Sequence, residues 1–351
     1  EQLAAKIQGI VEPMKVRVIS KGSALHYYVM KPLQVALHST MRQFNEYRLI
    51  GRPLSPTDVM DLYLSPIAHG LNGDEEWISV DYSGATDNLS WKYSGAIFNY
   101  LIDELPEEFC DIANQVLGPH RLEYPTLGRY SYKGDMKRGQ LMGSILSFPI
   151  LCAANLGLYL DVTEDYHQGW TYQERMDSVL INGDDQLYLA PKSLFQRHIE
   201  TGLKVGLEMT VGKAYHHPRY TNVNSTCVDC PIGGTPYQVN FLNTGLFFGQ
   251  HKVMARIEAD TYDTSTITRM GLVNVLPKVL DGALPGRQLA LISKWFSVHR
   301  DQIRKDTYIK TLSGVHHRNL FLPIEFGGMG VPCPLGFRFF VSKADRKFAQ
   351  Q

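Results

Sequence analysis

The sequence predicts an α+β fold built on an antiparallel sheet. Two observations carry this prediction. Short β-rich runs alternate irregularly with longer segments of helical periodicity, and an Asn-Gly dipeptide joins two apolar runs in the manner of a hairpin. The chain has 351 residues, of which 44% are hydrophobic and 20% charged, so it can form two or three lobes with packed interiors.

The first part of the chain contains two predicted strands and a helix. The basic run over 15–19 indicates a short strand. Apolar residues recur at helical spacing over 29–50, and a glycine and a proline then end the pattern. A β-rich run over 77–80 predicts a second strand, which ends directly before Asp81.

The middle of the chain predicts two helices separated by an irregular segment. Residues 88–102 have helical spacing, with Asp87 or Asn88 as the N-cap. Residues 112–139 are rich in Gly, Pro and Tyr, so we expect no regular structure there. Residues 144–160 are strongly apolar, which is typical of a buried helix.

A hairpin is the next predicted element. The apolar runs 179–181 and 187–189 flank Asn182-Gly183-Asp184-Asp185, and Asn-Gly favours a tight two-residue turn. The remaining predicted elements are a helix over 192–205, a second hairpin over 237–248 and mainly helical chain over 264–310.

Composition and charge narrow the class of protein. No stretch of eighteen or more apolar residues occurs, so we expect no membrane span. The five cysteines are few and mostly far apart, which favours a reducing compartment over a disulfide framework. The net charge is zero, but the charges are distributed unevenly along the chain: residues 1–53 carry +5, residues 74–111 carry −9 and residues 287–318 carry +5. This order can place metal ions centrally and phosphates on both sides, although ordinary solvated helix faces produce the same pattern.

Two acidic sites, about a hundred residues apart, form the candidate catalytic centre. Asp81 follows a β-rich run and Asp87 lies six residues further on, whereas Asp184 and Asp185 lie in the predicted hairpin turn. Phosphoryl transfer requires alignment and charge compensation, and two Mg²⁺ ions held by carboxylates supply both. We therefore expect Asp81 and Asp184 to converge on a pair of ions. The structural alternative is that acidic residues simply suit a hairpin turn.

The order of the motifs resembles viral RNA-dependent RNA polymerases, in particular the narnavirus-like and ourmiavirus-like (botourmiavirus) group. The matching segments are Lys15-Val-Arg17-Val-Ile-Ser-Lys21, Asp81-Tyr-Ser-Gly-Ala-Thr-Asp87, Arg138-Gly139-Gln-Leu-Met-Gly143-Ser144-Ile-Leu-Ser147, Gly183-Asp184-Asp185 and the more distant Lys213. Each motif is weak alone, but their single fixed order over most of the chain makes the resemblance specific.

The resemblance implies a right-hand polymerase fold with an antiparallel-sheet palm, partial fingers and a helical thumb. It assigns residues 1–73 to the fingers, 74–250 to the palm with 104–139 as a fingers insertion, and 251–351 to the thumb. The implied activity is template-directed nucleotidyl transfer for viral genome replication. The implied partners are an RNA template, its product strand and ribonucleoside triphosphates, and the implied cofactor is a pair of Mg²⁺ ions, for which Mn²⁺ can substitute. We expect replication in the host cell cytoplasm, or in mitochondria if the chain is nearer to mitoviruses.

The same resemblance assigns roles to individual residues. Asp81 and Asp184 would be the main metal ligands, Asp185 an auxiliary one, and Lys213 the acid that protonates the leaving pyrophosphate. The residues expected to contact the incoming nucleotide are Lys15, Arg17, Lys21, Asp87, Ser147 and Asn155, and those expected to lie close to the template are Gly139, Gly143 and Ser144.

Structural alternatives stay open for several of these residues. Asp87 can be a helix N-cap, Lys213 an ordinary surface lysine, and the basic strand an exposed strand with solvated charges. Asn155 lies one helical turn beyond the usual asparagine of the family, at whose position this chain has Leu151. A buried, satisfied polar group is the alternative for Asn155.

Two rival functions remain at the level of sequence. A reverse transcriptase or another palm polymerase shares the paired carboxylates, but reverse transcriptases usually have an aromatic and a variable residue where this chain has Asn182-Gly183. The second rival is a non-catalytic RNA-binding module with a zinc site, for which the candidate ligands are His216, His217, Cys227 and Cys230.

Overall fold

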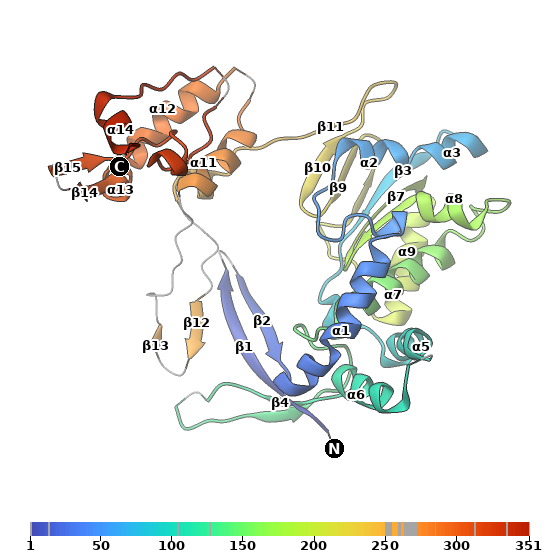
Figure 1. Cartoon of the computed structure of the whole chain (residues 1–351). Helices are drawn as coiled ribbons and strands as arrows, with labels where there is room; N and C mark the ends of the chain where they lie inside the picture. The colour runs from blue at the N-terminus through green and yellow to red at the C-terminus, as the bar shows by residue number, and fades with distance from the viewer. Residues whose placement is uncertain are drawn as a thin grey trace. The chain divides into compact units, whose positions relative to one another are not determined.

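A computed structural model describes residues 2–12, 15–103, 105–126, 128–249, 255–258, 261–262, 272–284, 286–311, 314–334 and 336–350. The chain divides into two compact units (Figure 1). Most of the first unit is Lys15–Val239, and the second is built mainly from residues that follow Asn240. Within the described ranges, no helix is both long enough and apolar enough to cross a bilayer.

A four-stranded antiparallel sheet, in the order β6-β7-β3-β8, organises the first unit. Its strands are β3 (Glu75–Val80), β6 (Val179–Asn182), β7 (Asp185–Pro191) and β8 (Tyr215–His217). β3 pairs with β7 along its whole length, in a register that places Val80 opposite Gln186. The predicted antiparallel sheet and the predicted hairpin are therefore confirmed.

The other elements of the first unit surround this sheet or form a second one. In chain order they are β1 (Ala4–Glu12), β2 (Lys15–Lys21), α1 (Ala24–Met41), η1 (Asn45–Tyr47), α2 (Pro56–Asp61), α3 (Leu64–His69), α4 (Ala85–Asn88), α5 (Trp91–Ile102), α6 (Glu107–Leu117), β4 (Arg121–Glu123), β5 (Lys133–Asp135), α7 (Ser147–Val162), α8 (Tyr172–Asp177), α9 (Ser193–Val205), β9 (Tyr220–Val223), β10 (Thr226–Asp229), β11 (Tyr237–Gln238), β12 (Ala255–Glu258) and β13 (Thr261–Tyr262). The second sheet has the order β13-β12-β1-β4-β5, with β2 on β1.

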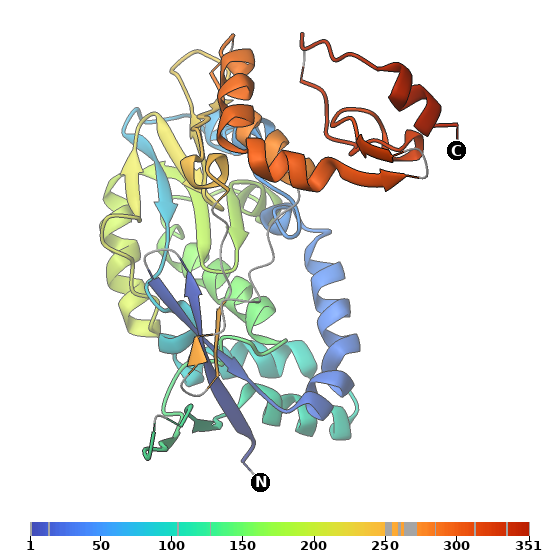
Figure 2. The same ribbon diagram turned by 90° about the vertical axis from the view of Figure 1, so that its left-hand side faces the viewer.

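Both faces of the β6-β7-β3-β8 sheet are buried, because successive side chains of a strand point to opposite faces. Ile78 and Val80 pack into a cluster with α7 and α9, whereas Trp77 packs on the other face against α2, β9 and β10. Figure 2 shows these layers from a second direction. The sheet is thus held rigidly on both sides, which positions the residues at the ends of its strands.

Most residues of α7 are buried, as its apolar sequence predicted. It lies between the sheet and α9 on one side and α1 and α5 on the other. A separate cluster joins α1, α5 and α6 around Met30, Phe98 and Val116. The helix that carries Ser147 and Asn155 is therefore a central support of the first unit.

The second unit is mainly helical, as predicted for much of 264–310. Its described elements are α10 (Thr244–Phe247), α11 (Leu272–Asp281), α12 (Gln288–Val298), α13 (Arg300–Thr307), β14 (Tyr308–Thr311), β15 (Gly314–His317), η3 (Ile324–Phe326) and α14 (Lys343–Phe348). Trp295 is fully buried in a cluster that α11 and α12 share. The predicted palm–thumb border at 250/251 lies outside the described residues, and the fingers–palm border at 73/74 stays a prediction.

Three local predictions were wrong. The segment 112–139 is not wholly irregular, because the end of α6 and the pair β4 and β5 lie within it. The predicted hairpin over 237–248 does not form: Asn243 accepts a hydrogen bond from the backbone N–H of Leu246 and starts the short helix α10 instead. The helix predicted over 29–50 begins at Ala24 and ends at Met41, with Pro32 tolerated inside it.

Candidate active site

The carboxylates of both acidic motifs gather at one end of the β6-β7-β3-β8 sheet. Asp81 directly follows β3, whose last residue Val80 lies opposite Gln186 of β7, so Asp81 and Asp185 continue adjacent strands. Asn182 pairs with Asp185, which makes Gly183-Asp184 the two-residue turn between β6 and β7. Gly183 has φ +70°, a conformation that glycine adopts at little cost.

The charges of these carboxylates act on one another. Burial raises the pKa of Asp185 from 3.8 to about 6, with further contributions from the charges of Asp184 and Asp81. Burial also raises the pKa of Asp184, and the charge of Asp81 adds to the increase while Lys213 and Arg17 oppose it. The register of β3 with β7, and of β7 with β6, brings these residues, about a hundred positions apart in the sequence, to one end of the sheet.

Asp81 is held by a loop that the sequence did not single out. The hydroxyl of Thr210 donates to Asp81 Oδ1 at 2.8 Å, and the backbone N–H of Thr210 donates to the Asp81 carbonyl at 2.8 Å. Lys213, from the same loop, places its Nζ 3.4 Å from Asp81 Oδ2 while its side chain stays 65% exposed. Lys213 is therefore at the site and accessible, whereas Thr210 orients the carboxylate.

Asp185 is held by a second unpredicted residue, Asn224. Asn224 and Ser225 form the tight turn between β9 and β10, with φ values of 52° and 57°. The backbone N–H of Asn224 donates to Asp185 Oδ2 at 3.2 Å, and its side-chain oxygen accepts from Asn182 Nδ2 at 2.7 Å. An Asn followed by a small polar residue between two short β-rich segments was a usable turn signal in the sequence.

Asn155 lies beneath the site and does not face a nucleotide. It is 0% exposed, its Oδ1 accepts from the hydroxyl of Tyr82 at 2.9 Å, and its Nδ2 donates to the Gly183 carbonyl at 3.2 Å. This geometry supports the alternative of a buried, satisfied polar group. We therefore do not propose Asn155 as a nucleotide contact.

The two glycines of the 138–147 loop approach the protein's own backbone. A Cβ at Gly139 would overlap the carbonyl of Asp87, and a Cβ at Gly143 would overlap the carbonyl of Ser20. The structure therefore accounts for these glycines by packing within the chain, and their closeness to the template stays a prediction. This packing fixes the loop against α4 and against the end of β2.

The two serines expected at the site are also occupied within the loop. Ser147 is 4% exposed and donates its hydroxyl hydrogen bond to the Leu141 carbonyl at 3.0 Å. Ser144 is 8% exposed, and its hydroxyl accepts from the backbone N–H of Leu146. Both hydroxyls shape the entry into α7, so we propose neither serine as a nucleotide or template contact.

The basic strand β2 supplies charge to the site from a remote part of the sequence. Burial raises the pKa of Asp184, and the charge of Arg17 acts in the opposite direction and lowers it. The backbone N–H of Ser20 donates to the Met142 carbonyl, and Lys21 at the strand end is exposed. Lys15 begins the strand, but its side chain lies outside the described part of the chain.

Asp87 is exposed and does not cap the long helix that follows. It lies in the short helix α4, whereas α5 has Ser90 as its N-cap residue, so the predicted cap was wrong. Ser83 is also exposed, and its backbone N–H donates to the Glu208 carbonyl at 2.8 Å. Asp87 and Ser83 thus remain available to a ligand.

The four candidate zinc ligands do not converge. Nδ1 of His216 is hydrogen-bonded to the Glu76 carboxylate, whereas His217 accepts hydrogen bonds at Nδ1 from two backbone N–H groups of the next turn. Cys230 is buried among apolar side chains of the sheet. Across the described ranges, no group of three or more His, Cys, Asp or Glu side chains is arranged to hold a metal ion.

That observation does not conflict with a magnesium site. Mg²⁺ is commonly bound through one or two carboxylates, with waters and substrate phosphates completing its octahedron, and not by a cage of protein ligands. Asp81 and Asp184 provide two carboxylates; burial raises the pKa of Asp184 most, and repulsion from the Asp81 charge raises it further. A bound cation would relieve this repulsion, so the donor set fits Mg²⁺ or Mn²⁺.

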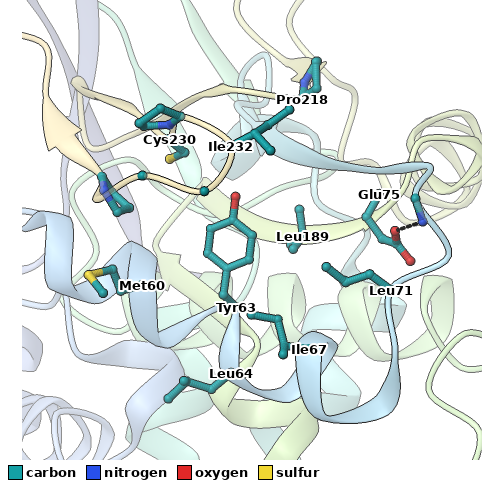
Figure 3. Close-up of a pocket in the computed structure, with 15 residues that line it drawn as sticks. Met60, Tyr63, Leu64, Ile67, Leu71, Glu75, Leu189, Pro218, Cys230 and Ile232 are labelled. Carbon is teal, nitrogen blue, oxygen red and sulfur yellow. Dashed lines mark hydrogen bonds between the residues drawn. The ribbon is translucent and has the colours of Figure 1, made fainter.

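A pocket of about 550 Å³ lies at the opposite end of β3, beside Glu75 (Figure 3). Tyr63, Ile67 and Leu71 line it from one side and the loop around Ile232 from the other. The carboxylate of Glu75 accepts hydrogen bonds from the backbone N–H groups of Asn72 and Gly73. The Tyr63 hydroxyl and the Cys230 thiol also belong to the lining, and the other labelled side chains are apolar.

Comparison with known proteins places this geometry in context. No family model matches the chain. The chain is 27% identical over 337 residues to the RNA-dependent RNA polymerase of Ourmia melon virus (isolate Melon/Iran/VE9), an alignment covering 92% of this chain and 38% of that protein. The chain therefore spans about two fifths of the curated relative that it matches. The predicted resemblance to viral RNA-dependent RNA polymerases of the ourmiavirus type is confirmed in sequence.

Solved structures show the same relationship in the fold. The crystal structure of the RNA-dependent RNA polymerase of a human picorbirnavirus matches with a TM-score of 0.59 and 13% identity, covering 84% of this chain and 56% of that one. An insertion loop deletion mutant of that polymerase matches with a TM-score of 0.52 and 13% identity, covering 86% and 61%. The predicted right-hand polymerase fold is confirmed by these matches.

Proposed function

We propose that this chain is the catalytic part of a viral RNA-dependent RNA polymerase, which joins ribonucleotides on an RNA template for genome replication. One observation carries the proposal: Asp81 and the Gly183-Asp184 turn meet at one end of a rigid sheet, with Lys213 and Arg17 in electrostatic range. The similarity to a viral polymerase over 92% of the chain supports it.

The metal ligands in this proposal are Asp81 and Asp184, with Asp185 in an auxiliary role. Bound Mg²⁺ ions would supply charge compensation and alignment for the attacking and leaving oxygens. Thr210 holds Oδ1 of Asp81, whose Oδ2 contacts the ammonium group of the exposed Lys213, and Asn224 holds Oδ2 of Asp185. A bound cation would replace Lys213 at Asp81 Oδ2, while Asp185 keeps its Oδ1 for a ligand. The chain thereby presents these groups without a large rearrangement.

The remaining residues of the proposal act on the nucleotide. Arg17 and Lys21 would bind the triphosphate, since guanidinium and ammonium groups pair well with phosphate oxygens. Asp87, with Ser83, would contact the ribose, whose 2′-hydroxyl distinguishes ribonucleotides from deoxyribonucleotides. Lys213 would donate a proton to the leaving pyrophosphate, because its exposed ammonium group lies beside the site.

The first test is primer extension on an RNA template with Mg²⁺ and, separately, with Mn²⁺. We expect extension by the unaltered chain and none by Asp184→Asn or Asp81→Asn, while RNA binding persists because the template is held mainly through phosphates. Asp111→Asn, an exposed position on α6, is the matched control and should extend normally. Extension near the unaltered rate by either site variant would remove the two-metal assignment.

The second test addresses Lys213. Lys213→Leu should slow elongation roughly a hundred- to ten-thousand-fold without ending it, as is typical for loss of a general acid. Lys213→Arg keeps the positive charge beside Asp81 but holds its proton too tightly to donate it. Proton donation predicts that both variants are slow, and single-turnover rates measure this. Full activity of Lys213→Arg would show that Lys213 contributes only its positive charge and does not donate a proton.

A reverse transcriptase remains the alternative within palm polymerases. Asp87 favours selection of ribonucleotides, since its exposed carboxylate can accept a hydrogen bond from a 2′-hydroxyl. Incorporation of ribo- and deoxyribonucleotides on one RNA template would be compared directly. Preference for deoxyribonucleotides would favour a reverse transcriptase over an RNA-dependent RNA polymerase. The zinc-module alternative is not favoured, because the described ranges hold no group of three or more His, Cys, Asp or Glu side chains arranged around a metal position.

A further inference from the structure

A buried asparagine connects the two motifs that carry the catalytic carboxylates. Tyr82 directly follows Asp81, and Gly183 directly precedes Asp184. The side chain of Asn155, from α7, accepts a hydrogen bond from the Tyr82 hydroxyl at 2.9 Å and donates one to the Gly183 carbonyl at 3.2 Å. A single side chain therefore ties together the neighbours of both carboxylates.

The bridge is anchored on both sides. The backbone carbonyl of Asn155 accepts from Gln186 Nε2 at 3.2 Å, and the thiol of Cys152, one turn earlier on α7, accepts from the Gly183 N–H at 3.2 Å. Both the N–H and the carbonyl of Gly183 are thus bound to α7. The turn that carries Asp184 is consequently fixed to a helix buried at the centre of the unit.

The Tyr82 end of the bridge has one hydrogen-bonding arrangement. Tyr82 donates to Asn155, so its oxygen accepts from His198 Nε2 at 2.7 Å, and His198 Nδ1 accepts from the Tyr188 hydroxyl at 2.8 Å. Burial lowers the pKa of His198 to about 3, which keeps the ring neutral in this arrangement. The chain of donors and acceptors therefore has a single direction.

We propose that Asn155 is a positioning residue that sets the separation between Asp81 and Asp184, and so preforms their site for Mg²⁺. The inference rests on the proposed function of these two carboxylates as metal ligands. Mg²⁺ demands near-ideal octahedral geometry at short distances, so freedom in the spacing of its ligands weakens binding. Groups that orient metal ligands typically change metal affinity by roughly 10- to 100-fold when removed.

Two variants test the bridge. Asn155→Ala removes both hydrogen bonds, and Tyr82→Phe removes a single hydroxyl, which keeps the test available if the first variant does not fold. The matched control is Tyr159→Phe, which removes another buried hydroxyl from the same core, where it donates to the Arg175 carbonyl. Circular dichroism and RNA binding establish that each variant is folded.

Two measurements report on the ions. The first is the Mg²⁺ concentration that gives half-maximal extension, and the second is direct Mn²⁺ binding followed by electron paramagnetic resonance without RNA or nucleotide. We expect Asn155→Ala and Tyr82→Phe each to need roughly tenfold more metal in both measurements. A variant that carries both substitutions should show less than the sum of the two effects, because both remove the same bridge. Tyr159→Phe should match the unaltered chain. Unchanged metal binding in folded Asn155→Ala and Tyr82→Phe would overturn the inference.

The two proposals fail in different ways. If the unaltered chain binds Mn²⁺ but never extends a primer, the proposed polymerase activity fails while the bridge is still judged by Mn²⁺ binding. If the chain extends primers and the bridge variants show the same metal dependence, only the bridge fails. Equal weakening by Tyr159→Phe would also reject it, because the effect would then be a general loss of core stability.

Discussion

The pKa of Asp185 is raised by its burial and by the two other carboxylates at the same end of the sheet. Its side chain is half-buried beside Asp184 and Asp81, and its pKa rises from 3.8 to about 6, first through burial and then through these charges. The folded chain holds this proton up to about pH 6, whereas an unfolded chain releases it near pH 3.8. The proton's contribution to stability is present below pH 3.8 and is lost as the pH rises through 6.

This sign predicts the effect of Asp185→Asn on the metal-free chain. At pH 7.5 the variant should unfold at a higher temperature, by about 3 °C, because it removes a half-buried charge while an amide oxygen can still accept from Asn224. At pH 5 the gain should largely vanish, since Asp185 is then protonated. Thermal melts in EDTA at both pH values check this. A lower melting temperature at pH 7.5 would contradict the assigned cause.

At the scale of elements, the contact between α4 and the 138–147 loop joins two motifs of the site. Gly139 donates its N–H to the Leu89 carbonyl, and its own carbonyl accepts from Trp91 Nε1 at 2.6 Å. Its φ of +77° and its closeness to the Asp87 carbonyl both exclude a side chain. The loop that leads into α7 and the segment after Asp81 are therefore locked together by one glycine.

Gly139→Ala should destabilise the first unit by roughly 3 kcal/mol, because backbone strain and overlap with a carbonyl add together. Gly73→Ala is the matched control, with a φ of +88° but open space around the new methyl group. It should lose only about 1 kcal/mol from backbone strain. Urea unfolding of both variants measures the difference. Equal losses would mean that the close approach to α4 does not matter.

At the scale of the whole molecule, the chain contains two units with separate hydrophobic clusters. Clusters around the main sheet and around α1, α5 and α6 belong to the first unit, and the cluster around Trp295 belongs to the second. Each cluster buries large side chains completely, including Phe98 at 1% exposure and Trp295 at 0%. Unfolding of such a chain is not expected to be two-state.

Paired variants test this division. Trp295→Ala should lower the stability of one calorimetric transition, by about 3–5 kcal/mol, and leave the other in place. Phe98→Ala should do the reverse, because it opens a cavity in the first unit. Differential scanning calorimetry of both variants distinguishes the transitions. A single transition that both substitutions shift equally would show that the two cores unfold together.

Much of the fold could be predicted from the sequence because it depends on local patterns. The β-rich run of β3, the apolar run of α7 and the Asn-Gly dipeptide beside the turn are properties of neighbouring residues, so this strand, the buried helix and the hairpin were identified correctly. The misread segment 237–248 has weak periodicity, and a single capping residue, Asn243, decided its structure. Such marginal segments follow caps and tertiary contacts more than pattern.

The candidate site was predictable in part. Acidic residues next to β-rich runs identified Asp81 and Asp184, and the position of Lys213 followed from the resemblance alone. Thr210 and Asn224 were missed because their role arises from contacts with residues remote in sequence, at Asp81 and Asp185. No local pattern distinguishes a threonine that orients a carboxylate from one that merely lies in a loop.

The sequence by itself determined the α+β class, the order of the principal strands and helices, and the carboxylates that can carry catalysis, because these depend on residue type and short-range spacing. Only the tertiary structure decided which polar groups face a ligand and which are buried. It turned Asn155 inward onto Tyr82 and Gly183, and it set Gly139 against the chain's own backbone. The physical reason is that burial and hydrogen-bond partners depend on which distant segments meet.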